Sequence, residues 1–422
     1  MTDTLLCGID IGSSKISTVV AMQSKEDEEL RIIGFNTTPS KGVRKGLIVD
    51  IEKVTVVVEE SVEKAERMAG HKIKNAFVSV GGPHIVSLNS HGIVAVSSPQ
   101  TEISQDDVDR VIEAARAISL SNTRQIIEVS PRDYIVNGQE GIKNPVGMTG
   151  VRLEVETHII TASQTNLKNI ERCLTDLDIQ NLGYVFSGLA SADAVVTNTE
   201  RELGIMLVDM GGGKTDICMY VEDALAYSSS IPVGARHITN DIAVGLKVSL
   251  DTAEKIKLHL SKTLSARNEA IRRKVYDSKI ADLNVGECVD DTSVKTLIDG
   301  IIVPRLEEIF KFISDEIEKS GFIEYIPSGL VITGGGALTV GALETGKRIV
   351  GLPIRIGVPQ GVSGLVDEIL DPQYATTIGL ILYGRNNIMA EEGWKNFNKV
   401  IKDFSLTNSV SKFKSFVKQF IP

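Results

Sequence analysis

Short apolar runs and longer amphipathic runs are mixed along the whole chain, a pattern typical of layered α/β proteins. Residues 5–10 and 16–22 are rich in β-branched side chains and flank the small polar turn Gly12-Ser13-Ser14. This arrangement predicts a β-hairpin. Further strands are expected at 77–82, 93–96, 125–136 and 151–161. We therefore predict an α/β fold.

The amphipathic runs predict helices with defined starts. Asp50 is placed to cap a helix whose apolar positions recur at helical spacing, at Val54, Val57, Val58, Val62 and Ala65. A capping box at Ser104–Asp107 predicts a second helix, a third is expected at about 164–177, and a capping box at Asp251–Glu254 predicts a fourth. Residues 83–162 thus form a strand–helix–strand insert between two larger blocks.

The two larger blocks begin alike. When Asp10 is aligned with Asp209, residues 7–21 match residues 206–220 in pattern at a constant offset of 199. Asp10 and Asp209, Gly12 and Gly211, and Lys15 and Lys214 are then the identical pairs. This internal repeat predicts two similar domains, each opening with a β-hairpin.

The repeated turns have the composition of an anion-binding site. Gly and Ser let backbone N–H groups converge on an anion, because few side chains block the approach. Either turn alone is more typical of an ordinary tight turn, but two matching turns facing each other would hold a polyphosphate from both sides. Asp10 and Asp209 would then orient Mg²⁺ through its waters, and Lys15 would add a point charge.

Commoner site motifs are excluded. A P-loop ending at Gly213-Lys214-Thr215 would need glycine where Val208 stands. A Rossmann turn should open a helix, whereas β-branched residues follow both turns. The six histidines lack the spacing of a zinc site.

Two later segments complete the candidate site. Leu330–Thr333 predicts a buried strand that runs into Gly334-Gly335-Gly336-Ala337, which suits either close approach to a nucleoside or a plain strand–helix junction. On the helix expected after Asp251, the polar residues Glu254, Lys257 and Ser261 share one face. That face is either a ligand contact or an ordinary solvated surface.

Composition narrows the class of protein. With 42% hydrophobic and 24% charged residues, the chain resembles a globular protein rather than a disordered one. Its net charge of −10 argues against nucleic-acid binding by the whole surface. No apolar run is long enough for a membrane span, and the N-terminus lacks a signal-peptide pattern. Cys7, Cys173, Cys218 and Cys288 include no CxxC pair and are expected to be buried thiols of a cytosolic protein.

The C-terminal stretch 394–422 differs from the rest of the chain. It holds the only tryptophan, Trp394, and five of the eleven phenylalanines. Six lysines and one aspartate give it a charge of +5, so residues 1–393 must carry −15 to reach the total of −10. The tail is therefore basic and aromatic on an acidic body.

The end of this tail predicts an amphipathic helix at 408–422. Its apolar residues occupy an arc of roughly 140°, and lysines flank it; they are Val410, Phe413, Phe416, Val417, Phe420 and Ile421 with Lys412, Lys414 and Lys418. A terminal helix packed on the body is the alternative. Because the predicted helix is terminal, is cationic and follows a polar segment, we expect it to lie on a membrane surface and to bind anionic lipids reversibly. Many tails on one polymer would bind by avidity.

Taken in order, IDIGSSK, VDMGGGKTD and ITGGGA resemble the phosphate and adenosine motifs of the actin, Hsp70 and sugar-kinase superfamily. Within it the chain most resembles the FtsA family of bacterial cell division. The specific stretches include GVRKGLIVDIE at 42–52, VSVGGPHIVSLNSHGIV at 78–94, SIPVGARHITNDIAVGL at 230–246 and PIRIGVPQGVSGL at 353–365. The similarity runs over nearly the whole length.

The resemblance implies an actin-like, ribonuclease H-like fold of two lobes with an FtsA-type 1C insert and a C-terminal amphipathic helix. The implied parts are subdomain 1A at 1–82 and 163–197, 1C at 83–162, 2A at 198–240 and 311–385, 2B at 241–310, a linker at 386–407 and the helix at 408–422.

The resemblance also implies ATP and Mg²⁺ between the lobes, with Glu254 and Lys257 at the adenosine. The expected nucleotide-binding residues are Asp10, Gly12, Ser13, Ser14, Lys15, Asp209, Gly211, Gly212, Gly213, Lys214, Thr215, Glu254, Lys257, Ser261, Gly334, Gly335, Gly336 and Ala337. Asp10 and Asp209 are the expected metal residues, and no catalytic base is assigned. Lys214 is a departure, because the family usually has threonine there.

The family is associated with polymerisation and with docking the tubulin-like protein FtsZ onto subdomain 2B, where Arg305 and Glu308 match the helix used. The resemblance thus implies a filament-forming adaptor, at most a weak ATPase. It would lie on the cytoplasmic face of the cell membrane at the septum, tether the FtsZ ring and bind other division proteins through 1C. The alternatives are a pilus-assembly actin homologue and a small-molecule kinase of the same superfamily. An Hsp70-like chaperone would need a further peptide-binding domain.

Overall fold

The computed structural model describes residues 4–24, 30–96, 102–265, 269–283, 292–364 and 369–387. Within them two sheets are built alike, each from a three-stranded antiparallel meander with a parallel strand beside its first strand. In the first sheet these are β1 (Thr4–Ile11), β2 (Lys15–Gln23), β3 (Leu30–Pro39) and β6 (Asn75–Val80); in the second they are β12 (Ile205–Met210), β13 (Thr215–Val221), β14 (Ala224–Ile231) and β15 (Leu330–Thr333). The two hairpins and the repeat predicted from the sequence are confirmed.

Each sheet is the centre of one lobe. The first lobe has the strand order β11-β6-β1-β2-β3-β17, and the second has β14-β13-β12-β15-β16. The additional strands are β11 (Gln180–Phe186), β17 (Val362–Gly364) and β16 (Ile354–Ile356), and a small hairpin in the first lobe pairs β4 (Val43–Arg44) with β5 (Leu47–Ile48). The buried residues of these strands form two hydrophobic clusters. One fills the first lobe and continues onto one face of the second sheet, and the other lies within the second lobe.

Helix α1 (Ile51–Ala69) covers the first sheet and begins where the sequence predicts. The Asp50 carboxylate accepts a hydrogen bond from the Lys53 N–H at 3.2 Å, and Gly70 ends the helix in the left-handed conformation. The expected apolar face, which includes Val54 and Val58, is buried. The other helices of this lobe are α3 (Gln164–Thr175), α4 (Ser187–Val195) and a helix through residues 375–387. The last of these runs two residues into the linker expected from residue 386.

The insert is a separate four-stranded sheet in the order β7-β10-β8-β9, with one helix against it. Its elements are β7 (Val86–Ala95), α2 (Gln105–Arg116), β8 (Arg124–Val136), β9 (Gln139–Ile142) and β10 (Arg152–Ser163). The predicted capping box is confirmed, because Ser104 and Asp107 each bond the other's backbone N–H. Strand β7 is longer than the predicted 93–96, and β9 is an additional strand.

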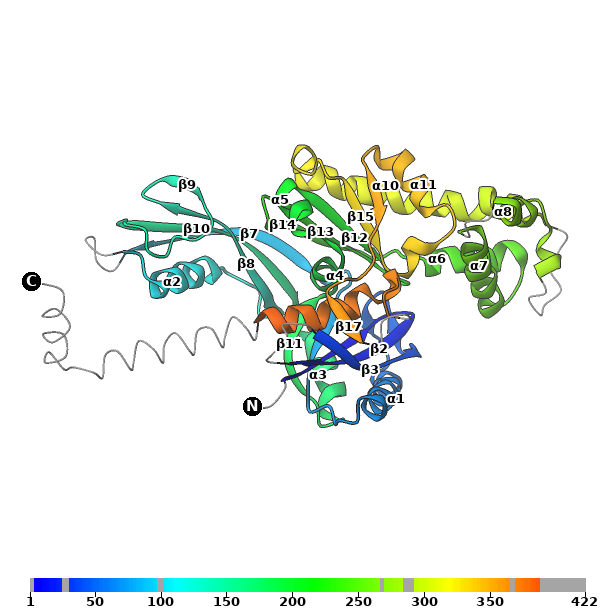
Figure 1. The fold of residues 1–422 in the computed structure, drawn as a ribbon, viewed down its shortest axis with the longest axis horizontal. Helices are drawn as coiled ribbons and strands as arrows, with labels where there is room; N and C mark the ends of the chain where they lie inside the picture. The colour runs from blue at the N-terminus through cyan, green and yellow to red at the C-terminus, as the bar shows by residue number, and fades with distance from the viewer. Residues whose placement is uncertain are drawn as a thin grey trace, which may run out of the picture.

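The insert rests on the second lobe through β14. His158 Nε2 lies 3.0 Å from Ser228 Oγ, and Ser87 Oγ donates to the Ser228 carbonyl at 2.6 Å. Burial lowers the pKa of His158 to about 3, so the ring is neutral in this contact. Figure 1 shows the insert at one end of the molecule and α7 and α8 at the other.

The second lobe carries the remaining helices. They are α5 (Asn198–Leu203), α6 (Arg236–Leu246), α7 (Leu250–Leu264), α8 (Glu269–Tyr276), α9 (Val294–Leu297), α10 (Val303–Ser320) and α11 (Ala342–Val350), with a π-helical turn η2 (Ile298–Ile302) and 3₁₀ turns η1 (Ile280–Leu283), η3 (Ile323–Tyr325), η4 (Gly335–Leu338) and η5 (Pro372–Tyr374). The predicted start of α7 is wrong in one respect. Ser249, not Asp251, is the N-cap, and its hydroxyl accepts from the Thr252 N–H at 3.2 Å.

Three predictions concern residues that lie wholly or mostly outside this description. The amphipathic helix expected at 408–422 and most of the linker before it lie outside the described residues, as does Cys288. Cys7, Cys173 and Cys218 are buried free thiols, as expected. Within the described ranges, no helix has the length and apolar character that crossing a membrane requires.

Candidate functional site

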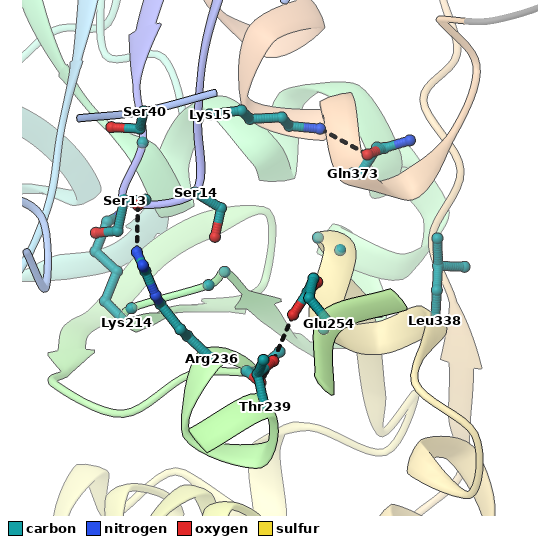
Figure 2. Close-up of a pocket in the computed structure, with 18 of the residues that line it drawn as sticks. Ser13, Ser14, Lys15, Ser40, Lys214, Arg236, Thr239, Glu254, Leu338 and Gln373 are labelled. Carbon is teal, nitrogen blue, oxygen red and sulfur yellow. Dashed lines mark hydrogen bonds between the residues drawn. The ribbon is translucent and has the colours of Figure 1, made fainter. Parts of the chain in front are cut away.

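A cavity of about 580 Å³ lies between the two lobes, a volume within the range of small-ligand sites. Both repeated turns, the third glycine cluster and the polar face of α7 contribute to its wall (Figure 2). The expected residues that line it are Asp10, Gly12, Ser13, Ser14, Lys15, Asp209, Gly211, Gly212, Gly213, Lys214, Glu254, Lys257, Ser261, Gly334, Gly335 and Gly336. The fold thus gathers into one cavity side chains that are more than 300 residues apart.

Two expected residues lie outside the cavity wall. Thr215 is fully buried, and its hydroxyl donates to the Val233 carbonyl at 2.8 Å, which joins β13 to the segment before α6. Ala337 is buried in the core of the second lobe. Both side chains are buried in the second lobe and do not reach the cavity wall.

The two turns approach each other so closely that no side chain would fit at Gly212 or Gly213. A Cβ added at Gly212 would lie 1.8 Å from Ser14 Oγ, and one added at Gly213 would lie 2.7 Å from Ser13 Oγ. Backbone N–H groups without neighbouring side chains are the donors that phosphate-binding turns use. The facing glycine turns therefore fit a phosphate chain held from both lobes.

The aspartates that precede the turns are held in place by hydroxyl groups. Ser79 Oγ donates to Asp10 Oδ1 at 2.6 Å, while Ser191 Oγ and Thr376 Oγ1 donate to Asp209 Oδ2 at 2.6 and 2.9 Å. Burial raises the pKa of Asp10, and the Ser79 bond and the Lys214 charge oppose that rise. Carboxylate oxygens are the ligands that Mg²⁺ prefers, so the pair fits a metal that ligand phosphates also coordinate.

The two equivalent lysines have different surroundings. Lys15 Nζ donates to Gln373 Oε1 at 2.9 Å and lies 3.7 Å from the centre of the Tyr374 ring. Burial lowers the pKa of Lys15 to about 8, against the opposing effect of Asp10. Lys214 instead forms an ion pair with Asp216 on β13. The repeat thus places one cationic side chain next to the turn of each lobe.

The polar face of α7 forms the opposite end of the cavity. Lys257 Nζ donates to Glu254 Oε2 and to Thr239 Oγ1, both at 2.9 Å. Ser261 Oγ accepts from the Val340 N–H at 3.1 Å, which ties α7 to the segment after the third glycine cluster. Because Leu258 and Leu338 also line this end, it combines apolar contacts with a few fixed polar groups, as nucleoside sites do.

The structure adds cavity residues that the sequence did not reveal. They include Asp216, Arg236, Thr239, Gln373 and Thr376. Arg236 Nη1 donates to the Ser13 carbonyl at 3.4 Å, a contact across the two lobes. The single glycine before α6, Gly234, was the available sign of this segment, whereas Gln373 stands in no recognisable motif.

The expected partner residues lie on α10, away from the cavity. Arg305 Nε and Nη2 donate to the two carboxylate oxygens of Asp241 at 2.5 and 3.0 Å, and Arg305 also pairs with Glu308. The Arg305 side chain is 27% exposed and that of Glu308 is 46% exposed. Arg305 therefore braces α10 against α6, and a role of this pair in partner binding stays a prediction.

The insert and the second lobe match known protein families. Residues 82–161 match a family model described as an SHS2 domain inserted in FtsA, and residues 206–379 match one described as cell division protein FtsA. The cell division protein FtsA of Borreliella burgdorferi is 37% identical over 418 residues, which cover 99% of this chain and 98% of the relative.

Solved structures show the same fold at low sequence identity. A PilM–PilN type IV pilus biogenesis complex covers 90% of this chain and 98% of its own, with a TM-score of 0.63 and 14% identity. MreB 5 of Spiroplasma citri bound to AMPPNP covers 94% of this chain and 98% of its own, with a TM-score of 0.51 and 13% identity. Similarity at this level shows a shared architecture of two lobes.

Proposed function

Because the chain belongs to the FtsA family of cell division proteins, with an actin-like fold and an SHS2 insert, we propose that it binds ATP, polymerises on the cytoplasmic membrane and tethers the FtsZ ring there. The single observation that carries the proposal is the convergence of two repeated turns on one cavity. Neither lobe alone offers a complete site, so a bound ligand would link the lobes.

Different groups of cavity residues would bind the phosphates, the Mg²⁺ and the adenosine of ATP. Backbone N–H groups of the two turns would bind the phosphates, and Lys15 and Lys214 would balance their charge. Asp10 and Asp209 would hold Mg²⁺, which supplies charge compensation to the phosphates when bound. Glu254, Lys257 and Ser261 would contact the adenosine. The MreB 5 structure, which has the same fold, is bound to AMPPNP, and this supports a nucleotide as the ligand.

Binding, rather than turnover, is the chemistry that these residues support. The carboxylates near the phosphate turns already accept hydrogen bonds from Ser79, Ser191 and Thr376, which hold their orientation. We assign no catalytic base and expect at most a weak ATPase. The function is then a nucleotide-dependent assembly, in which ATP holds the two lobes in one arrangement.

The tail would bind the membrane, and surfaces outside the cavity would bind the protein partners. Residues 408–422 have the sequence of an interfacial helix, and Lys412, Lys414 and Lys418 would attract anionic lipids with about 1 kcal/mol each. A helix this short binds reversibly by itself, but several tails on one filament bind by avidity. FtsZ would contact α10 near Glu308, and the insert would contact other division proteins.

Electron microscopy on an anionic lipid monolayer tests the proposal. With ATP and Mg²⁺, the full chain should form filaments on the monolayer and recruit purified FtsZ to it; without nucleotide, filaments should be few. A chain that binds ATP but stays as single particles on the lipid would contradict the polymerisation part. A chain whose filaments fail to recruit FtsZ would contradict the tethering part.

A further inference from the structure

Lys214 lies where the second lobe meets the first, and its charge is held in a fixed place. Its ammonium group donates to Asp216 Oδ2, and the two side chains are 12% and 1% exposed. Figure 2 shows Lys214 at the same end of the cavity as Ser13, away from Glu254. The ion pair is therefore part of the phosphate end of the cavity.

The first lobe encloses the lysine stem. A Cβ added at Gly81 would lie 2.2 Å from Lys214 Nζ, and a Cβ added at Gly46 would lie 3.0 Å from Lys214 Cδ. Both glycines belong to the first lobe, whereas Lys214 belongs to the turn of the second. Because backbone lies on these sides of the stem, the ammonium cannot move far from its position without opening the lobes.

The carboxylate that holds Lys214 is itself anchored. Ser230 Oγ donates to Asp216 Oδ1 at 2.5 Å, and the Gly82 N–H donates to Ser230 Oγ at 3.1 Å. The anchor thus also joins the two lobes. A carboxylate buried this deeply without a cation would be costly, so Asp216 and Lys214 keep each other in place.

Charge balance at the phosphate end depends on this lysine. The carboxylates of Asp10, Asp209 and Asp216 face three cationic groups, those of Lys15, Lys214 and Arg236. Without Lys214 this end would carry a net charge of −1 before any phosphate arrived, and a mobile cation or a proton on Asp216 would have to compensate it.

We propose that Lys214 is a tethered cation that does part of the work of a bound metal ion, so that this chain holds ATP with a reduced dependence on Mg²⁺. The inference rests on the proposed function, because it concerns how the same cavity holds the same ligand. Lys214 is a specificity-determining residue in this sense, since it sets whether metal-free ATP, with its higher negative charge, is accepted.

The test is the affinity for ATP measured by calorimetry with excess Mg²⁺ and again with EDTA and no added metal. Removal of Mg²⁺ should weaken ATP binding of the native chain by less than about tenfold, whereas in Lys214→Met it should do so by about a hundredfold or more. Methionine keeps the stem between Gly46 and Gly81 and removes only the charge. Lys64→Met, which removes an exposed lysine paired with Glu60 on α1, is the matched control and should behave as the native chain.

A second variant changes the charge in the opposite direction. Asp216→Asn keeps the shape and the lysine but removes one negative charge, so metal-free ATP should bind several-fold more tightly than it binds the native chain. This arm keeps the proposal falsifiable if Lys214→Met does not fold, which circular dichroism would show. Equal metal dependence in the native chain and Lys214→Met, or no tightening in Asp216→Asn, would overturn the proposal. A folded native chain that binds no ATP with or without Mg²⁺ would instead overturn the proposed function.

Discussion

Ser191 of α4 donates a 2.6 Å hydrogen bond to Oδ2 of Asp209, the carboxylate at the end of β12. Thr376 donates to the same oxygen from the helix through residues 375–387, at 2.9 Å. All three side chains are buried. The orientation of the second-lobe carboxylate is therefore fixed by two other elements, one of which is 167 residues away in sequence.

Replacing Ser191 with alanine should loosen that carboxylate. The loss of a buried hydrogen bond to a charged group should lower the free energy of unfolding by about 1–3 kcal/mol. The affinity for ATP and Mg²⁺ should also fall, because Asp209 gains freedom to rotate. Urea unfolding with and without the ligand measures both effects. Ser121→Ala, which removes an exposed bond to Thr123, is the control, and equal behaviour of the two variants would contradict this role.

Two neighbouring glycines should respond differently to alanine. Gly334 has φ +81°, and an added Cβ would lie 2.3 Å from Asp209 Oδ1, so Gly334→Ala strains the backbone and displaces the carboxylate. At Gly335 the nearest atom to an added Cβ is Gln373 Cβ at 3.7 Å, an ordinary contact. We expect Gly334→Ala to cost about 1–3 kcal/mol and to lose the rise in Tm that ATP and Mg²⁺ produce. Gly335→Ala should keep that rise; similar thermal shifts in both variants would show that the contact is unimportant.

Lys15 should make ATP binding depend on pH. Burial lowers its pKa from 10.5 to about 8, so at pH 8.5 more than half of the free protein has this lysine neutral. Bound phosphates favour the charged form, and ATP binding at pH 8.5 should therefore take up a fraction of a proton. Calorimetry in two buffers of different ionisation enthalpy measures the uptake. The native chain should show it and Lys15→Met should not; no buffer dependence in the native chain would refute the assignment.

The same shift also affects the stability of the protein without ligand. An unfolded chain, whose lysine keeps its usual pKa, binds more protons than the folded chain between about pH 8 and pH 10.5. The contribution of Lys15 to the free energy of unfolding therefore rises with pH across this window. Comparison of the native chain with Lys15→Met isolates the contribution: the native-minus-variant difference should increase from pH 8 to pH 10.

The tail should bind anionic lipid vesicles. A chain ending at Thr407 loses the predicted helix, and it should no longer sediment with vesicles that contain anionic lipids. In the full chain, Phe413→Ser together with Phe416→Ser should have the same effect, because the apolar face is interrupted. Ser409→Ala in the preceding polar segment should bind normally. Continued sedimentation of the shortened chain would rule out this anchor.

The proposed FtsZ contact on α10 can be tested separately from the contribution of α10 to the stability of the protein. Glu308→Ala should weaken FtsZ binding without changing the free energy of unfolding, because its carboxylate is half exposed. Asp241→Asn weakens the brace to Arg305, so it should lower the free energy of unfolding by about 1 kcal/mol while FtsZ binding persists. Binding measured by sedimentation and unfolding measured by urea distinguish the two. Unchanged FtsZ binding by Glu308→Ala would place the docking surface elsewhere.

Local patterns in the sequence were sufficient to predict the two repeated hairpins. Asp10 and Asp209 end equivalent strands, so an alignment of the chain with itself located both carboxylates and the turns after them. The start of α1 was also predictable, because Asp50 acts on a residue three positions away. At α7 the same kind of reasoning chose Asp251, although Ser249 caps the helix; two nearby residues could each serve, and the tertiary course of the chain decides between them.

Residues placed by long-range packing could not be predicted in this way. Gln373 meets Lys15 across 358 residues of sequence, and Thr376 meets Asp209 across 167. Asp216 corresponds to Ser17 in the repeat alignment, so the repeat gave no sign of its ion pair with Lys214. Such contacts depend on how the lobes close on each other, which no local pattern encodes.

If one ligand is held by both lobes, hydrogen–deuterium exchange with and without ATP and Mg²⁺ will show it. Exchange should slow on binding in the turn before Lys15, in the turn before Lys214 and in the segment that begins at Gly334. Protection confined to one of the two turns, or protection in neither, would contradict it.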